Sequence, residues 1–356
     1  MQHLVNHWPD ASAAWSFLIA QPGGRTEGSE RQTGAPVATL AAGAAEFARQ
    51  LEAAASSTIH LHYVSFGYDA NGCPEWLVDG LERWKRAAGG RQLFVFFHEL
   101  STMVPPWKRM FWSQPRQRAI IQRLTAAADA CATNCPAFLR RLIRDFGADP
   151  TRLMMTPVGP NLEAPDGFER RRTGPPKPPY HLLIFGLPGS RHRTLHAHRH
   201  LLRILNERGQ LGSVHLAGHL AGVRDTQTAQ KVIGRGSTVL QTHPDLDAEA
   251  FAHLANAVDF SLLWYWPEIL GKSSVFAVNS VFGIPSIIVE RGPRESGFLT
   301  EPNCYVCPRS GTGLRRFIER LSDAAALVEV TRCLGQLTKD TLSWPAIAVR
   351  LFLHFR

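Results

Sequence analysis

The sequence predicts an α/β protein with two Rossmann-like domains that face each other across a cleft. Short apolar segments alternate with amphipathic helical segments along the chain, and a proline-rich segment interrupts this alternation near the middle. The length of 356 residues also exceeds what one hydrophobic core usually organises. Strands that alternate with helices run parallel, because each helix carries the chain back across the sheet.

In the first half, apolar runs bounded by turn residues predict strands, and apolar residues three or four positions apart predict helices. The predicted strands are Trp15–Ala20, Ile59–Phe66, Leu93–Phe97, Ala130–Thr133 and Leu153–Thr156. The predicted helices are Pro36–Ala54, Trp76–Ala87, Pro115–Ala128 and Pro136–Phe146. These elements indicate a first domain over residues 1–160.

Residues 161–180 contain the run Gly174-Pro175-Pro176-Lys177-Pro178-Pro179, which predicts a linker. The alternation then resumes, and it predicts a second domain over residues 181–340. Its predicted strands are His181–Phe185, Ser213–Ala217, Ser237–Leu240, Phe260–Trp264 and Ser286–Glu290. Its predicted helices are Arg193–Glu207, Asp247–Ala257, Lys272–Val281 and Gly311–Asp323. Residues 341–356 predict a last helix, around Trp344–Phe355, that returns to the first domain.

The composition is that of a globular protein, with 44% hydrophobic and 19% charged residues. Lys and Arg number 39 against 30 Asp and Glu, and the net charge of +9 suits phosphorylated ligands, an anionic membrane or nucleic acid. No module that interleaves basic and aromatic residues is recognisable, so we expect no nucleic-acid partner. Since neither a signal-peptide pattern nor a membrane-spanning apolar window is present, we expect a cytoplasmic protein.

The sequence does not predict a metal site. Cys304 and Cys307 form a C-x-x-C pair, but Cys131 and Cys135 would have to converge with them to complete four zinc ligands. A run of histidines between residues 192 and 200 is interleaved with arginines, which repel cations. We interpret these histidines as side chains of a solvated helix.

Two strand ends carry candidate site residues. His98 and Glu99 directly follow a predicted strand, at the edge where open α/β sheets bind ligands. The segment Gly271-Lys272-Ser273-Ser274 opens a predicted helix, so its backbone N–H groups, the helix dipole and Lys272 could hold a phosphate. A serine-capped helix start with a solvated lysine is the alternative.

Further polar residues surround the same predicted edge of the second domain. Arg191 and Arg193 follow the strand and turn that end at Gly186–Gly189, and they could hold a diphosphate by paired hydrogen bonds or form a basic first helical turn. Glu268 could accept hydrogen bonds from sugar hydroxyls or face water. Neither glycine turn has the G-x-G-x-x-G spacing of a dehydrogenase, and no Walker motif is present.

Taken together, several segments resemble the GT-B glycosyltransferases of family four, and the likeness covers nearly the whole chain after about residue 15. The segments are His62–Tyr68, Phe97–Leu100, Pro106–Arg109 with Phe111-Trp112, Phe185–Arg191, and Gly271–Ser274 leading to Gly283–Pro285. The resemblance implies a GT-B fold and transfer of a sugar from a nucleotide diphosphate donor, with retention of configuration. It also implies that neither a metal nor a cofactor is needed.

In such enzymes the first domain mostly holds the acceptor, and the second holds the nucleotide sugar. The resemblance assigns catalytic contact with the donor sugar to His98. It assigns charge neutralisation of the leaving diphosphate to Arg191, Arg193 and Lys272, where each contact lowers the reaction barrier. Acceptor contacts, to a glycan, lipid-linked or protein acceptor, fall on Tyr68, Glu99 and Trp107.

Two Glu separated by seven residues normally bind the sugar and the ribose in this family. Glu268 stands for the first, as a second catalytic residue, whereas the other would fall near Val278, with Asn279 as the nearest substitute. The remaining donor contacts are placed on small residues of the turns, namely Gly23, Gly24, Gly186, Gly271, Ser273 and Ser274.

Two alternatives share the nucleotide-sugar ligand: an epimerase or other enzyme of the same fold, and a non-catalytic binding protein. The absence of the second Glu leaves the non-catalytic binding protein as an alternative. The basic and aromatic segment Pro105–Trp112 has two interpretations as well. It could lie at a lipid interface on the inner membrane face, or it could pack its aromatic side chains against the acceptor cleft.

Overall fold

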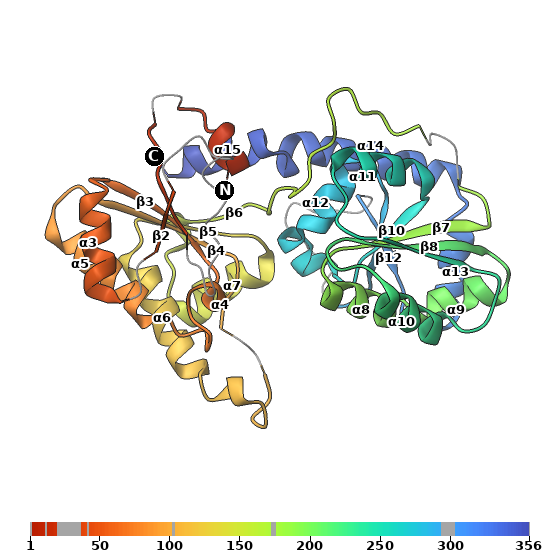
Figure 1. Cartoon of the computed structure of the whole chain (residues 1–356), viewed down its shortest axis with the longest axis horizontal. Helices are drawn as coiled ribbons and strands as arrows, with labels where there is room; N and C mark the ends of the chain where they lie inside the picture. The colour runs from red at the N-terminus through yellow and green to blue at the C-terminus, as the bar shows by residue number, and fades with distance from the viewer. Residues whose placement is uncertain are drawn as a thin grey trace. The chain divides into compact units, whose positions relative to one another are not determined.

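A computed structural model of the chain consists of two compact units (Figure 1). The first unit comprises Met1–Thr156 with Ile347–Arg356, and the second comprises Pro157–Ala346. The structure describes residues 2–10, 13–19, 37–40, 43–101, 104–171, 176–292 and 303–355. Each unit has a parallel sheet flanked by helices, which confirms the predicted α/β class with two Rossmann-like domains.

The first unit contains a four-stranded parallel sheet in the order β3-β4-β5-β6. Its strands are β3 (Thr58–Tyr63), β4 (Gln92–Phe97), β5 (Ala130–Thr133) and β6 (Leu153–Met155). A separate pair of parallel strands is formed by β1 (Phe17–Ile19) and β2 (Val37–Thr39). In β4 all residues but the first are buried, as expected for an inner strand of a parallel sheet that is covered on both faces.

Helices cover both faces of this sheet. Those on the larger core are α3 (Ala44–Ala53), α5 (Glu75–Ala87), α6 (Gln114–Ala127) and α7 (Pro136–Phe146). The remaining helices of the unit are α1 (Gln2–Asn6), α4 (Ser65–Tyr68) and the end of α15 (Trp344–His354). Phe355, which follows α15, stacks on Phe94 with ring centroids 4.5 Å apart, and His354 Nε2 lies 3.1 Å from the carbonyl of Cys131. The last ten residues therefore belong to the first unit.

The second unit contains a six-stranded parallel sheet in the order β12-β11-β10-β7-β8-β9. Its strands are β7 (Tyr180–Phe185), β8 (Leu211–Ala217), β9 (Val239–His243), β10 (Phe260–Leu262), β11 (Ser286–Val289) and β12 (Tyr305–Cys307). The chain builds outward from β7 through β8 and β9, and then returns to place β10 on the other side of β7. This reversal between β7 and β10 is the point where open parallel sheets bind ligands.

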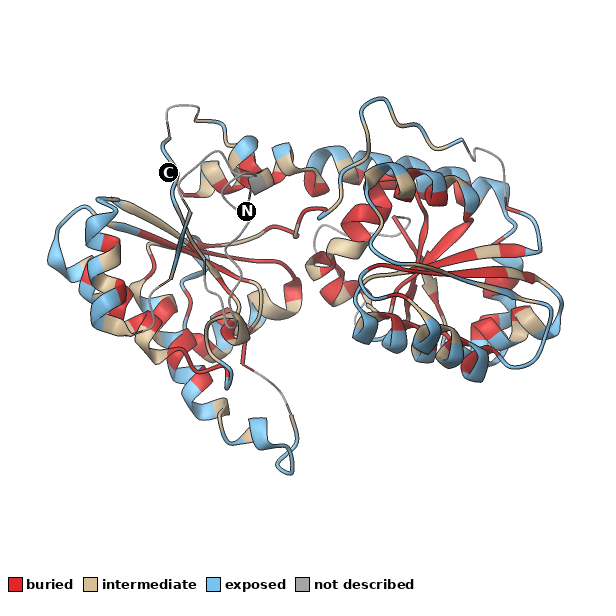
Figure 2. Ribbon diagram, viewed as in Figure 1, coloured by how far each residue is buried: buried red, intermediate tan, exposed pale blue. Residues whose placement is uncertain are grey.

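Helices on the two faces of the second sheet bury separate cores, and Figure 2 shows buried residues along the strands and the inner sides of the helices. One face is covered by α8 (Pro188–Ala197), α9 (Arg199–Glu207), α10 (Val223–Ile233) and α13 (Gly311–Arg320). The other face is covered by α11 (Ala248–Ala257) and α12 (Ser274–Val281). After these, α14 (Ala324–Leu337) continues through a π-helical turn at Thr338–Leu342 into α15. None of the helices in the described part of the chain is long and apolar enough to cross a membrane.

The predicted linker at residues 161–180 belongs to the second unit where the structure describes it. Arg170 donates hydrogen bonds to the carbonyls of Ala255, Val258 and Gly283, at 3.1, 2.6 and 2.9 Å. Phe168 packs on the same side, with its ring 5.3 Å from that of Phe282. The segment is thus packed against the domain rather than spanning between domains, and only residues 172–175 of it lie outside the described part.

The predicted helix Arg193–Glu207 is two helices, α8 and α9, which meet at His198. His198 is 2% exposed, and its Nε2 lies 2.8 Å from the carbonyl of Leu263, directly after β10. The interpretation of this histidine as solvated is therefore wrong, because the side chain satisfies a buried carbonyl. Pro36–Ala54 also differs, since Val37–Thr39 forms β2 and the helix begins at Ala44.

Candidate functional site

The loops after β7 and β8 of the second unit meet beside the start of α12. Gly186 follows β7 with φ 132°, and a Cβ atom there would lie 3.3 Å from the side chain of Val275 on α12. Gly218 follows β8 with φ 112°, and its Cβ would lie 2.6 Å from the carbonyl oxygen of Gly186. Only glycine combines these backbone angles with so close an approach. The glycines therefore bring three chain segments together at the strand ends.

The helix α12 begins at Ser274, two residues later than the sequence predicts, because Pro267–Lys272 forms a 3-10 helix before it. Ser273 is buried and caps α12, and its side chain accepts a hydrogen bond from Phe276 N at 3.1 Å. The capping interpretation is thus correct for Ser273. It does not exclude the phosphate interpretation, because the other N–H groups of a first turn have no partner within the helix and attract anions.

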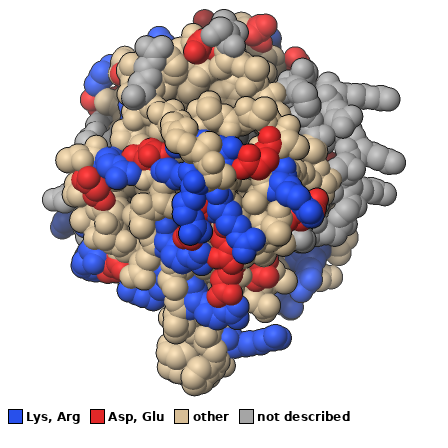
Figure 3. Space-filling view, turned by 90° about the vertical axis from the view of Figure 1, so that its left-hand side faces the viewer, with Lys and Arg blue, Asp and Glu red and all other residues tan. Residues whose placement is uncertain are grey.

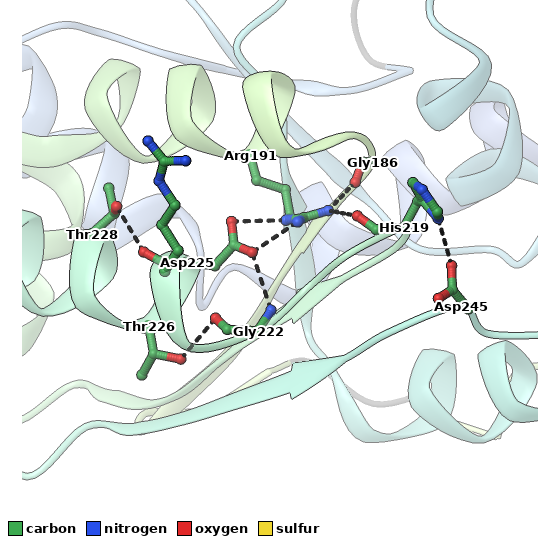
Figure 4. Close-up of polar contacts among 9 residues, drawn as sticks. Gly186, Arg191, His219, Gly222, Asp225, Thr226, Thr228 and Asp245 are labelled. Atoms are coloured by element: carbon green, nitrogen blue, oxygen red, sulfur yellow. Dashed lines mark hydrogen bonds and ion pairs between the residues drawn. The ribbon is translucent and has the colours of Figure 1, made fainter. Parts of the chain in front are cut away.

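Arg191 is not at the surface, contrary to what its predicted role as a phosphate ligand requires. Its side chain is fully buried and forms a two-pronged ion pair with Asp225 of α10, at 2.8 and 3.1 Å (Figure 4). The same guanidinium donates to the carbonyl of Gly186 and, at 3.1 Å, to that of His219. Arg191 therefore ties together the loops that follow β7 and β8. Its role in the structure is to position Gly186.

Arg193, one helical half-turn further along α8, is exposed and lies over an aromatic ring. Its guanidinium carbon is 4.4 Å from the ring centre of Trp264, which follows β10, and its Nε donates to the carbonyl of Gly189 at 3.1 Å. This places a cation at the point where the sheet order reverses. A second such contact joins Arg291, after β11, to Trp266 at 4.3 Å. The run Trp264-Tyr265-Trp266, which begins two residues after β10, is a signal that the sequence analysis missed.

Asn279 cannot replace the missing ribose-binding Glu, because its side chain lies in the core. It is 0% exposed, and its Nδ2 donates to Ser261 Oγ at 2.8 Å and to Ser286 Oγ at 3.3 Å. These bonds tie α12 to β10 and β11. Val278 is likewise 0% exposed. No side chain at these two positions therefore reaches a ligand.

In the first unit, His98 follows β4 and stacks with two neighbouring rings. Its Nε2 lies 2.8 Å from Nδ1 of His62 in β3, and its ring stacks on Phe96 with centroids 4.4 Å apart. Burial, together with the nearby His98, holds the pKa of His62 well below its usual range. His62 is therefore a neutral group that fixes the orientation of His98. The sequence analysis included His62 only within the segment His62–Tyr68 and gave it no role. Its pairing with His98 depends on the register of β3 and β4, which the sequence alone does not show.

The predicted acceptor residues have different surroundings. The Tyr68 hydroxyl donates to the carbonyl of His62 at 2.8 Å, and burial raises its pKa to about 12, so it is a neutral, bonded group. Glu99 is partly exposed beside His98, whereas Trp107 is 81% exposed on a loop further along the chain. Gly23 and Gly24 lie outside the described residues. Glu268, Gly271 and Lys272 all belong to the 3-10 helix before α12.

Buried polar atoms mark the ends of the strands in the first unit. The Tyr63 hydroxyl, Asn134 Oδ1 and Thr156 Oγ1 have no hydrogen-bond partner within the described residues. They follow or end β3, β5 and β6, on the edge that also carries His98. Asn134 Nδ2 donates to the carbonyl of His98 at 3.3 Å. A buried edge with unused hydrogen-bonding capacity suits a polar ligand.

Comparison with known proteins agrees with this geometry. Residues 1–159 match the model of the glycosyl transferase 4-like domain family. No curated protein matches the sequence.

Solved structures give a likeness across both units. Sucrose-phosphate synthase from Thermosynechococcus elongatus has a TM-score of 0.60 and 16% identity, covering 96% of this chain and 87% of its own. HepE from Anabaena, solved with UDP-glucose, has a TM-score of 0.58 and 14% identity, covering 92% and 86%. WaaG, a glycosyltransferase involved in lipopolysaccharide biosynthesis, has a TM-score of 0.52 and 13% identity, covering 86% and 93%. Residues 1–159 thus resemble the glycosyl transferase 4-like domain, and the chain as a whole has the GT-B fold, with two units that each contain a parallel sheet flanked by helices.

Proposed function

We propose that this protein transfers a sugar from a nucleoside diphosphate donor to a glycan, lipid-linked or protein acceptor, with retention of configuration. The start of α12 carries the proposal, because a capped helix N-terminus, a glycine loop and an exposed arginine lie at the reversal point of one parallel sheet. That combination suits a diphosphate. The complex of HepE with UDP-glucose supports a nucleotide sugar as the ligand.

The residues of the second unit would bind and neutralise the leaving group. Departure of the diphosphate builds negative charge, and fixed cations lower the barrier by stabilising that charge. Arg193 and Lys272 are the proposed cations, and the first-turn N–H groups of α12 are the proposed hydrogen-bond donors. With this charge supplied by the chain, the proposed reaction needs no metal and no cofactor.

In the first unit, His98 is the proposed contact to the donor sugar, with Glu99 on the acceptor side. His62 holds the His98 ring by a 2.8 Å contact, which favours a single ring orientation. A cytoplasmic location, where the protein would meet its nucleotide-sugar donor, is part of this proposal.

A non-catalytic nucleotide-sugar-binding protein is the second candidate. It is favoured by one observation, namely that Val278 and Asn279 are both buried where a ribose-binding Glu is expected. Thermal stabilisation by a panel of nucleoside diphosphate sugars tests binding, which both candidates require. Release of nucleoside diphosphate in the presence of acceptors, and the anomeric configuration of the product, then separate them. Stabilisation by no member of the panel would reject both.

Lys272→Ala tests the phosphate site directly. Loss of a hydrogen bond to a charged group costs about 1.5–3 kcal/mol, so affinity for the nucleoside diphosphate should fall roughly 10- to 100-fold, measured by calorimetry. Affinity for the bare nucleoside should stay the same. Lys231→Ala on the exposed surface of α10 is the charge-matched control. Equal losses for both ligands, or no loss for either, would make Gly271–Ser274 a helix cap only.

A further inference from the structure

The loop between β4 and α6 has a defined conformation where the structure describes it. Lys108 N donates to the carbonyl of Pro105 at 3.0 Å, and Phe111 N donates to that of Lys108 at 2.8 Å, which starts a 3-10 turn over Arg109–Phe111. Gln114 Nε2 donates to the carbonyl of Val104 at 3.1 Å and closes the base of the loop. Residues 104–113, here called the tryptophan loop, are therefore held by their own hydrogen bonds.

The tryptophan loop exposes large apolar side chains. Trp107 is 81% exposed, Trp112 is 74% exposed and Met110 is 39% exposed. These tryptophans are the only aromatic residues among the exposed large hydrophobic side chains of the described chain. Phe111 contacts Trp112 edge-to-face, with centroids 5.6 Å apart. The interpretation in which this segment packs its aromatic side chains against the acceptor cleft does not agree with the exposure of Trp107 and Trp112.

Positive charge accompanies these rings. Between Leu100 and Ala128 the sequence has five basic residues and no acidic one. Arg116 and Arg123 pair with carboxylates of α5, whereas Lys108 and Arg109 have no carboxylate partner among the residues that the structure describes. In Figure 3 the loop forms the lobe at the bottom, with an uncharged tip and Lys or Arg atoms beside it. The loop thus combines an apolar tip with adjacent cations.

We propose that the tryptophan loop docks the first unit onto an anionic lipid bilayer. Tryptophan side chains partition into the interface of a bilayer, where the ring contacts apolar chains and its N–H group stays hydrated. Lys108 and Arg109 are attracted by anionic headgroups at the same depth. A second copy of the chain fits less well, because two such loops would bring like charges together. The tryptophan loop is a surface of the first unit, and its docking does not depend on the proposed reaction.

Sedimentation with vesicles of phosphatidylcholine and phosphatidylglycerol in equal parts tests this docking. The full chain should bind these vesicles and should bind pure phosphatidylcholine vesicles much more weakly. Each adjacent cation contributes about fivefold to the partition coefficient, so Lys108→Gln with Arg109→Gln should weaken binding roughly 25-fold. Trp107→Ser with Trp112→Ser should weaken binding at least as strongly, since it removes the apolar contact. Both pairs change exposed side chains, and unfolding curves check that they leave the fold intact.

Matched controls use equally exposed residues of the second unit. Arg224→Gln with Lys231→Gln removes two exposed cations of α10, and Val223→Ser with Val328→Ser removes two exposed apolar side chains. Neither control should change vesicle binding. Failure of the full chain to bind, equal binding to both kinds of vesicle, or equal losses in loop and control variants would overturn the proposal. Concentration-dependent dimerisation that is lost with the two tryptophans, without vesicle binding, would assign the loop to a second copy instead.

Discussion

Breaking the ion pair between Arg191 and Asp225 should destabilise the second unit strongly. The Arg191 side chain is 0% exposed and that of Asp225 is 11% exposed. Asp225→Ala leaves a buried guanidinium without its counter-charge, which costs roughly 3–5 kcal/mol. At about 2–4 °C per kcal/mol for a unit of this size, the melting temperature should fall by roughly 6–20 °C. Because the uncompensated charge is the largest part of the cost, Arg191→Met combined with Asp225→Leu should recover part of the loss, while the carbonyls of Gly186 and His219 lose their donor.

The free energies of unfolding come from urea titrations followed by tryptophan fluorescence. Asp245→Ala is the matched control, because Asp245 pairs with His219 at 2.9 Å with both side chains more than 60% exposed (Figure 4). Such an exposed pair contributes about 0–1 kcal/mol. Equal costs for Asp225→Ala and Asp245→Ala would refute the reasoning. The reasoning would also be refuted if Arg191→Met kept its stability but lost its affinity for nucleoside diphosphate, because Arg191 would then contact the nucleotide directly.

Two further substitutions test the surroundings of this site. Gly218→Ala should lower the free energy of unfolding by roughly 1–3 kcal/mol and weaken nucleotide binding, because its Cβ would lie 2.6 Å from the Gly186 oxygen. Gly209→Ala is the control, since φ is also positive there but no atom lies within 4 Å. This control should leave nucleotide binding unchanged in calorimetry. His198 has its pKa lowered from 6.5 to about 4 by burial, so the unfolded chain binds the extra proton. The free energy of unfolding should thus fall by up to roughly 3 kcal/mol as the pH drops from 6.5 towards 4. His198→Gln should flatten that dependence in urea titrations at several pH values, and an unchanged slope would contradict it.

Local signals in the sequence were sufficient for most strands and, to within two residues, for the start of α12, but they missed β2 and β12. Apolar runs such as Leu93–Phe97 and His181–Phe185 coincide with β4 and β7 to within one residue. The errors arise where a contact distant in sequence overrides the local pattern. The helix around His198 breaks because that side chain meets a carbonyl 65 residues away. Likewise, the described part of the predicted linker before residue 172 packs onto the second unit because Arg170 binds carbonyls 85 to 113 residues away.

The two arginines of α8 illustrate the same limit for the site. Arg191 and Arg193 have the same chemistry and stand two positions apart, which is about 200° around an α-helix. Their side chains must therefore point to nearly opposite sides, so that one faces the interior when the other faces solvent. The periodicity alone does not say which one is inside, because Asp225, which compensates the buried charge, lies 34 residues later. With Arg191 committed to the glycine loop, the proposed diphosphate at α12 would rely on Lys272 and on Arg193, which Trp264 holds after β10. Arg191 thus holds the glycine loop, and Arg193 supplies charge to the proposed ligand. Substitution of Arg191 should therefore mainly lower the free energy of unfolding, and substitution of Arg193 should mainly lower the affinity for nucleoside diphosphate.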